Sequence, residues 1–123
     1  MSLIVLVEDE DYLRSVIEQM LRQGGHDVVV AASGKEAMGV CRENAVDLVI
    51  TDLAMPGMDG IELIRCLRGS HNGLPILAMS GTFTGQFFKM AELMGAVGTL
   101  AKPFKQADLL AMIDKSLARE AGS

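Results

Sequence analysis

Several features that mark large classes of protein are missing or scarce in this sequence. It has no tryptophan, three prolines and two cysteines in 123 residues. No apolar run approaches the roughly 18 residues of a membrane-spanning helix. The apolar stretch at residues 3–7 is too short for the core of a signal peptide and is followed by acids. We therefore expect a cytoplasmic protein without a membrane segment.

An excess of positive charge is also missing, because the formal net charge is −5 at pH 7. A domain that binds nucleic acid on its own needs a basic face that neutralises phosphates. We therefore expect no direct nucleic acid binding by this domain. Cys41 and Cys66 stand alone, without the spacing of metal ligands, and this favours buried thiols in a reducing compartment over a disulfide.

Half of the residues are apolar, and a chain of this length suits one globular domain, which we place at residues 1–123. Apolar runs without polar alternation predict buried parallel strands, at residues 3–7, 28–31, 46–51, 75–79 and 97–101. Helical periodicity follows each run, and Ser33 with Glu36 has the spacing of a capping box. Five βα units predict an α/β fold, with a doubly wound parallel five-stranded sheet covered by helices on both faces.

Polar residues follow four of the five predicted strands. Glu8 and Asp9 follow the first strand, and Asp52 follows the third. Ser80 follows the fourth strand and Lys102 the fifth. The carboxyl ends of parallel strands form one edge of a sheet, and the ligands of open α/β sheets bind there. We therefore expect these five side chains to lie close together.

This set of side chains favours phosphoryl transfer assisted by Mg²⁺. Mg²⁺ prefers oxygen ligands and usually needs one or two carboxylates beside phosphate oxygens. We expect Asp9 and Asp52 to supply the carboxylates. Glu8 is expected to act through water, and the backbone carbonyl of Ala54 to complete the set.

Asp52 is the expected nucleophile, because a carboxylate can take a phosphoryl group as an acyl phosphate. Lys102 and the Ser80 hydroxyl are expected to contact the phosphoryl oxygens, whose negative charge a cation stabilises. Each residue also has an ordinary explanation: Asp9 or Glu10 suits a helix cap, and Asp52 suits a turn before a proline. Their coincidence at one edge favours a site.

The sequence resembles the receiver domain of bacterial two-component response regulators, from Leu3 to about Leu117. Four segments carry the resemblance: residues 6–10, 51–60, 79–81 and 101–104. The pattern Asp-x-x-Met-Pro-x-Met-Asp-Gly, which begins at Asp52, is the most specific part. Within the family, the chain is similar to the chemotaxis-type single-domain regulator.

The resemblance implies a flavodoxin-like (βα)5 fold with strand order 2-1-3-4-5. It implies that Asp52 accepts a phosphoryl group from a phosphohistidine on a sensor histidine kinase or a histidine phosphotransfer protein. It assigns metal binding to the two acids after the first strand, the phosphoryl-sensing hydroxyl to Ser80 and the phosphate-contacting cation to Lys102. It also implies a cis peptide bond between Lys102 and Pro103.

Departures from the family pattern concern the site and its readout. Glu8 stands where the family more often has Asp, a substitution that it tolerates. Thr99 stands where many members have a Tyr or Phe that turns inward on phosphorylation. We therefore expect Ser80 and Thr99 to form a switch without a ring. Residues 95–99 also lack the charges expected where DNA-binding members dimerise.

Three alternatives fit the sequence less well. An aspartyl phosphatase or phosphotransferase needs Asp-x-Asp near the first strand and a cap, whereas residues 8–10 read Glu-Asp-Glu and the chain has no room for a cap. A nucleotide-binding module needs Gly-x-Gly-x-x-Gly after the first strand. A pseudo-receiver that only scaffolds has no need of the acidic cluster. The sequence thus predicts a phosphorylation-controlled binding module rather than an enzyme, with an unknown output partner.

Overall fold

The computed structural model describes residues 2–54, 60–81 and 84–121, and within them strands and helices alternate strictly. The elements in chain order are β1 (Leu3–Val7), α1 (Asp11–Gln23), β2 (Asp27–Ala31), α2 (Gly34–Glu43), β3 (Leu48–Asp52), α3 (Gly60–Ser70), β4 (Ile76–Ser80), α4 (Thr84–Leu93), β5 (Gly98–Ala101) and α5 (Gln106–Ala121). The predicted α/β alternation is confirmed. Residues 55–59, the centre of the specific pattern, lie outside the described residues.

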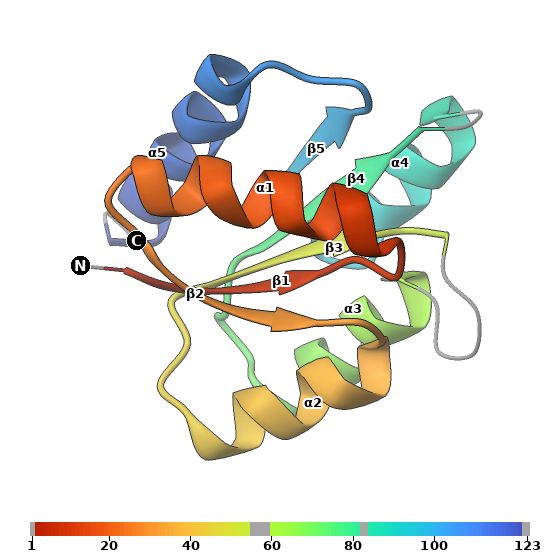
Figure 1. Cartoon of the computed structure of the whole chain (residues 1–123). Helices are drawn as coiled ribbons and strands as arrows, with labels where there is room; N and C mark the ends of the chain where they lie inside the picture. Colours follow the sequence, from red (N-terminus) through yellow and green to blue (C-terminus); the bar gives the residue numbers. More distant parts are fainter. Residues whose placement is uncertain (1, 55–59, 82–83, 122–123) are drawn as a thin grey trace.

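The five strands form one parallel sheet in the order β2-β1-β3-β4-β5, as Figure 1 shows. The predicted flavodoxin-like order is therefore confirmed. Every residue of β3 and β4 is buried, which explains why their sequences are continuous apolar runs rather than alternating ones. The third strand begins two residues later than predicted and extends through Asp52, because Asp52 still pairs with Met79 of β4.

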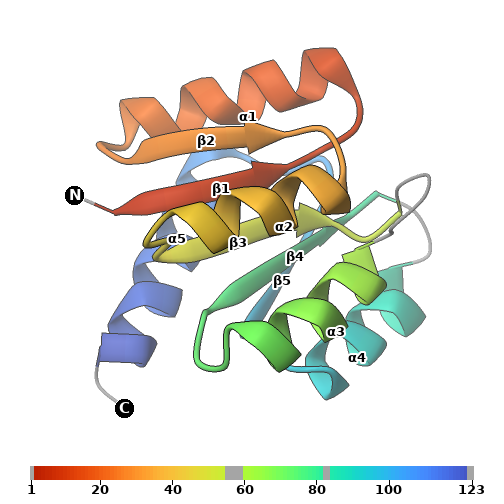
Figure 2. The ribbon, with the colours of Figure 1, turned by 90° about the horizontal axis from the view of Figure 1, so that it is seen from below.

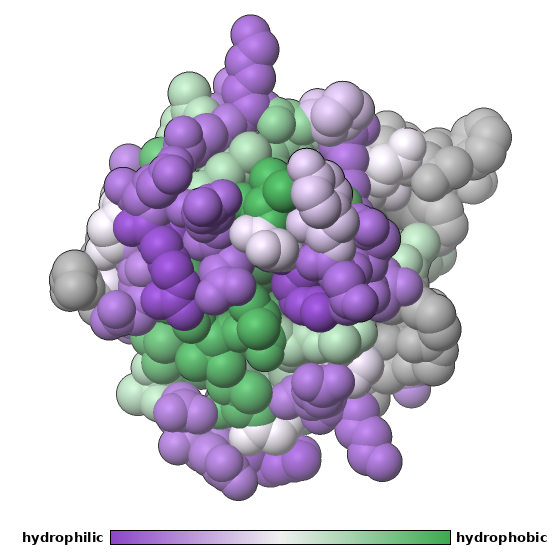
Figure 3. All heavy atoms as spheres, viewed as in Figure 1, coloured by the Kyte–Doolittle hydropathy of each residue, from purple (hydrophilic) through white to green (hydrophobic). Residues whose placement is uncertain are grey.

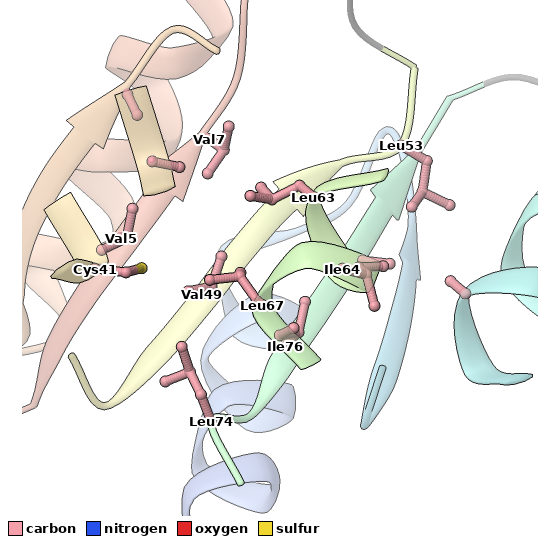
Figure 4. Packing of buried hydrophobic residues seen from close by; sticks show 14 residues of the cluster. Val5, Val7, Cys41, Val49, Leu53, Leu63, Ile64, Leu67, Leu74 and Ile76 are labelled. Atoms are coloured by element: carbon pink, nitrogen blue, oxygen red, sulfur yellow. The ribbon is translucent and has the colours of Figure 1, made fainter. Parts of the chain in front are cut away.

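Helices cover both faces of the sheet. α1 and α5 lie on one face, and α2, α3 and α4 lie on the other (Figures 1 and 2). The core between the sheet and the second group includes side chains of β1, β3, β4, α2 and α3 (Figure 4): Val5, Val7, Val49, Ile76, Cys41, Leu63, Ile64 and Leu67. Each such aliphatic side chain contributes roughly 1.5–3 kcal/mol when fully buried. This packing holds the strand ends, and the residues after them, in fixed positions.

The predicted ends of the helices match local backbone geometry. Gly24 caps α1, and Gly25 has a φ of 90°, a conformation that glycine adopts without strain. The Ser33 side chain caps α2 by accepting a hydrogen bond from the Glu36 amide (3.2 Å). Within the described part of the chain, no helix is long and apolar enough to cross a membrane.

Both cysteines are free thiols, as predicted, but the predicted burial is confirmed only for Cys41, because Cys66 is partly exposed on α3. Cys41 is buried in the core, and burial raises the pKa of its thiol.

The edge strand β2 carries an apolar surface between the hydrophilic residues of α1 and α2 (Figure 3). Arg22 donates a hydrogen bond to the backbone carbonyl of Val28 (2.9 Å) and so covers part of this edge.

Candidate functional site

Side chains at the ends of three strands meet at the carboxyl edge of the sheet. Glu8 and Asp9 follow β1, and Asp52 is the last residue of β3. Each of these three acids offers a carboxylate oxygen, and the three oxygens lie within 4.8 Å of one another. Lys102, after β5, brings its Nζ to 2.7 Å from Glu8 Oε1 and 3.2 Å from Asp52 Oδ2. The edge therefore combines three carboxylates with one ammonium group.

Glu8 and Lys102 form a buried ion pair, since their side chains are 1% and 15% exposed. Burial raises the pKa of Glu8, and the nearby charge of Asp52 adds to this; the hydrogen bonds from Lys102 and Glu10 offset only part of it. Burial alone lowers the pKa of Lys102, but the hydrogen bond to Glu8 and the negative charges of Asp52 and Glu8 outweigh it and leave the pKa raised. Lys102 therefore stays charged at neutral pH.

Both carboxylate oxygens of Glu8 already have protein partners. Oε1 accepts from Lys102, and Oε2 accepts from the Glu10 amide (3.1 Å). The backbone of Glu8 is also held, because its amide donates to the Ala31 carbonyl (3.0 Å) and its carbonyl accepts from Arg14 Nη1 (2.9 Å). Glu8 is thus a fixed part of the site, and direct ligation by it requires one of these contacts to open.

Asp9 has a different environment from its neighbours. Its side chain is exposed and makes no hydrogen bond or ion pair with the residues that the structure describes. Glu10, not Asp9, caps α1, because its side chain accepts from the Leu13 amide (2.8 Å). The ordinary explanation as a helix cap therefore holds for Glu10 and leaves Asp9 available to a ligand.

Asp52 lies at the bottom of the cluster and is 7% exposed. Oδ1 accepts a long hydrogen bond from the Ala54 amide (3.4 Å), and Oδ2 contacts Lys102. Ala54 itself is exposed in the turn after β3. The weak contacts of the Asp52 carboxylate contrast with the short ones of Glu8, so Asp52 is the freer of the two buried acids.

Gly60 is a residue whose importance the sequence did not reveal beyond its place in the specific pattern. A Cβ atom on Gly60 would lie 2.2 Å from the backbone oxygen of Asp52 and 2.6 Å from the Cα of Leu53. The Gly60 amide donates to the Leu53 carbonyl (3.1 Å). The first residue of α3 therefore rests directly on the backbone that carries Asp52, and only glycine fits there.

The two predicted switch residues lie in different places. Ser80 is buried at the end of β4, pairs with Ala101, and accepts the Lys102 amide on its backbone oxygen (2.9 Å). Thr99 pairs with Ala78, further from the carboxyl edge. It lines a hollow of about 290 Å³ together with residues of the α4–β5–α5 face: Glu92, Val97, Gly98, Met112, Lys115 and Ser116.

A second hollow, of about 490 Å³, opens beside Lys102. It is mainly apolar and is lined by α1 and by the loops after β4 and β5: Leu13, Val16, Ile17, Met20, Gly81, Lys102, Pro103 and Phe104. The peptide bond between Lys102 and Pro103 is cis, as the resemblance implies.

The donor set of the cluster suits a hard metal ion. It consists of carboxylate oxygens without thiolate or imidazole, and such sets favour Mg²⁺, Ca²⁺ or Mn²⁺ over softer metals. Three acids this close also repel one another unless a cation offsets their charge. The residues present therefore fit a divalent ion.

Comparison with known proteins agrees with the fold and with the geometry of the acidic cluster. The profile of the response regulator receiver domain matches residues 4–114. The chain belongs to this family. Two curated relatives of the receiver domain are the response regulator protein FleR of Pseudomonas aeruginosa, 38% identical over 112 residues, and the transcriptional regulatory protein PrrA of Mycobacterium tuberculosis, 32% identical over 120 residues.

The matches cover 89% and 98% of this receiver domain but only 23% of FleR and 51% of PrrA. The chain thus spans about half, or less, of the length of these relatives. Among solved structures, the chemotaxis protein CheY4 of Vibrio cholerae is 28% identical with a TM-score of 0.90, and the match covers 95% of this chain and 99% of CheY4.

Proposed function

We propose that Asp52 accepts a phosphoryl group from a phosphohistidine on a sensor histidine kinase or a histidine phosphotransfer protein, in a Mg²⁺-dependent reaction. The observation that carries this proposal is the position of Asp52. It is a buried carboxylate with weak contacts, and it lies within 4.8 Å of two further acids and 3.2 Å from a lysine. A structural aspartate needs none of these neighbours.

In the proposed step, an oxygen of Asp52 attacks the phosphorus atom and an acyl phosphate bond forms. The bond from phosphorus to the imidazole nitrogen breaks, its electron pair stays on that nitrogen, and the nitrogen is then protonated. Lys102 holds its positive charge beside the new phosphoryl oxygens. Ser80, buried at the next strand end, is proposed to sense those oxygens with its hydroxyl group.

Mg²⁺ is proposed to be held by Asp9 and Asp52, with Glu8 acting through water and the backbone carbonyl of Ala54 as a further ligand. When bound, Mg²⁺ would neutralise negative charge on the phosphoryl oxygens. Asp9 suits direct ligation because its carboxylate is exposed, whereas both oxygens of Glu8 accept hydrogen bonds from the protein. Melting temperature should therefore rise with Mg²⁺ concentration.

The donor protein has to bring its phosphohistidine over the edge that carries Asp52. We propose that it packs against the apolar hollow of about 490 Å³, because this hollow shares Lys102 with the site. Val16→Glu places a charge in the hollow away from the acids. It should slow phosphotransfer from a histidine kinase and leave phosphorylation by a small phosphodonor unchanged; equal rates from the kinase would exclude this contact.

The proposed activity is that of a signalling phosphoacceptor in the cytoplasm, rather than of an enzyme that turns over a substrate. Phosphorylation is proposed to shift the equilibrium between two states of the face formed by α4, β5 and α5, with Ser80 and Thr99 as the switch. One receiver domain over residues 1–123, with no membrane or direct nucleic acid binding by this domain, is part of this proposal.

The deciding experiment is intact-mass and NMR analysis with a small phosphodonor and Mg²⁺. The wild type should gain one phosphoryl group, and Asp52→Asn should gain none. Asp114→Asn, a change of an exposed aspartate on α5, is the matched control and should keep the adduct. Absence of both an adduct and Mg²⁺-induced shifts near Asp52 would favour the scaffolding alternative.

A further inference from the structure

Arg14 connects the acidic loop after β1 to the first turn of α1. Its Nη1 donates to the backbone carbonyl of Glu8 (2.9 Å), and its Nη2 lies 2.6 Å from Oδ1 of Asp11. The Arg14 side chain is 19% exposed, whereas that of Asp11 is 91% exposed. Arg14 therefore reaches inward to the loop, while its partner carboxylate stays in solvent.

We propose that Arg14 is a positioning residue for the metal site: it fixes the peptide unit between Glu8 and Asp9, and through it the direction of the Asp9 carboxylate. The inference rests on the proposed function, because it takes the acidic cluster to be a Mg²⁺ site. Arg14 itself touches neither the phosphoryl group nor the metal.

The geometry of the loop explains why such a residue is needed. Asp9 has no hydrogen-bonding partner among the described residues, so nothing orients its carboxylate directly. The peptide unit is planar, so fixing the Glu8 carbonyl also fixes the Asp9 amide and the direction in which its Cα lies. The flanking groups are held as well, because the Glu8 amide donates to Ala31 and the Glu10 amide donates to Glu8. Arg14 adds a contact at the Glu8 carbonyl, which lies between these two amides.

The positive charge of Arg14 and its positioning role predict opposite changes in Mg²⁺ affinity when Arg14 is replaced, so the proposal is testable. A guanidinium near three carboxylates repels an incoming cation, so a purely electrostatic role predicts tighter Mg²⁺ binding once the charge is removed. A positioning role predicts weaker binding, as is found when partners that orient metal ligands are removed. A role in folding alone predicts a change in melting temperature with unchanged Mg²⁺ affinity.

Arg22 provides a matched control on the same helix. It donates Nη2 to the backbone carbonyl of Val28 (2.9 Å) and pairs its Nε with Glu18 (3.0 Å), so its contacts are of the same kind. These contacts lie on α1 itself and on the edge strand β2, away from the three acids. Arg22→Met therefore removes comparable interactions without touching the loop after β1.

The experiment is a Mg²⁺ titration of the metal-free, unphosphorylated chain, followed by calorimetry and amide NMR shifts, with a thermal melt of each variant. Arg14→Met should weaken Mg²⁺ binding about tenfold. Arg14→Lys keeps the positive charge and the helix propensity of the position. It should also weaken Mg²⁺ binding, since one ammonium group cannot replace the guanidinium contacts to both the Glu8 carbonyl and Asp11. The Asp9 amide should shift in both variants before metal is added. Arg22→Met should bind Mg²⁺ as the wild type does.

The outcomes separate this inference from the proposed function. If the wild type binds Mg²⁺ and both Arg14 variants bind it equally well or more tightly, the positioning role is overturned and the proposed function is not. Wild type that binds no Mg²⁺ would overturn the proposed function and this inference with it. Equal weakening in Arg22→Met would show a general loss of stability and would also overturn the role of Arg14.

Discussion

Lys102 Nζ lies 2.7 Å from Glu8 Oε1, so the cation after β5 and the acid after β1 form a buried ion pair across the edge of the sheet. The same ammonium group lies 3.2 Å from Asp52 Oδ2. One lysine therefore serves two carboxylates. A phosphoryl group on Asp52 would be a third anionic group competing for the Lys102 ammonium group. Because Lys102 lies in the loop after β5, this competition would link phosphorylation to the position of that loop.

The first prediction concerns the removal of that cation. Lys102→Met leaves Glu8 buried without its oppositely charged partner, so the free energy of unfolding at pH 7 should fall by about 3 kcal/mol. Urea denaturation in the presence of a chelator measures it. The double variant with Glu8→Gln should recover most of the loss, because the buried charge is gone. Lys105→Met, at an exposed lysine on the same segment, should change stability by less than about 0.5 kcal/mol. A loss that the double variant does not recover would contradict the role of the ion pair.

The second prediction is a pH dependence set by Glu8. Burial raises its pKa above the ordinary 4.5, so the folded state binds a proton more tightly than the unfolded chain does. The contribution of Glu8 to stability is therefore fully present below the ordinary value, and it is lost as pH rises through the raised pKa. Above that pKa the charged carboxylate carries its full burial cost.

The test compares wild type with Glu8→Gln, whose amide does not titrate, by chemical denaturation in metal-free buffer. The free energy of unfolding of the wild type minus that of the variant should fall as pH rises from about 4.5 toward neutrality. A difference that rises with pH over this range would mean that Lys102 outweighs the burial of Glu8.

Much of this architecture was accessible from the sequence for physical reasons. Strands buried on both faces must be continuous apolar runs, and the residues after them must share one edge, so the grouping of Glu8, Asp52 and Lys102 followed from their order in the chain. The strand order came from the resemblance to receiver domains. The pattern was therefore sufficient for the α/β alternation and for bringing these three side chains to one edge, whereas the strand order needed the resemblance.

Other features depend on three-dimensional contacts that no pattern in the chain encodes. Asp11 and Arg14 read as an ordinary ion pair three residues apart on a helix, and only the fold brings Arg14 to the Glu8 carbonyl. The choice between Asp9 and Glu10 as the helix cap depends on which carboxylate reaches the Leu13 amide. The need for Gly60 depends on how closely α3 approaches the backbone of β3.

The third prediction tests that approach. In Gly60→Ala the new Cβ would meet the backbone oxygen of Asp52 at 2.2 Å, so α3 or the turn after β3 has to move. Stability should fall by about 1–3 kcal/mol, and phosphorylation by a small phosphodonor should slow because Asp52 shifts. Gly39→Ala is the control, since nothing lies within 4 Å of its new Cβ. That change, inside α2, should raise stability by about 0.5–1 kcal/mol. Equal effects of the two changes would contradict the close approach.

The last prediction concerns the readout face. Thr99 borders a hollow of about 290 Å³ between α4, β5 and α5, so a larger side chain has room there. Thr99→Phe should change the free energy of unfolding by less than about 1 kcal/mol, whereas Leu100→Phe should lose about 1–3 kcal/mol by overpacking. Leu100 is the adjacent residue of β5 and is buried in the core beneath α1 and α5. Urea denaturation of both variants measures the difference. If the Thr99 variant lost as much as the Leu100 variant, the hollow would be closed in solution, and a ring at this position could not join the switch. If Thr99→Phe is tolerated, the NMR shifts of α4 and α5 on phosphorylation should differ from those of the wild type. The ring then fills the hollow between these helices, which in the wild type is open to a partner.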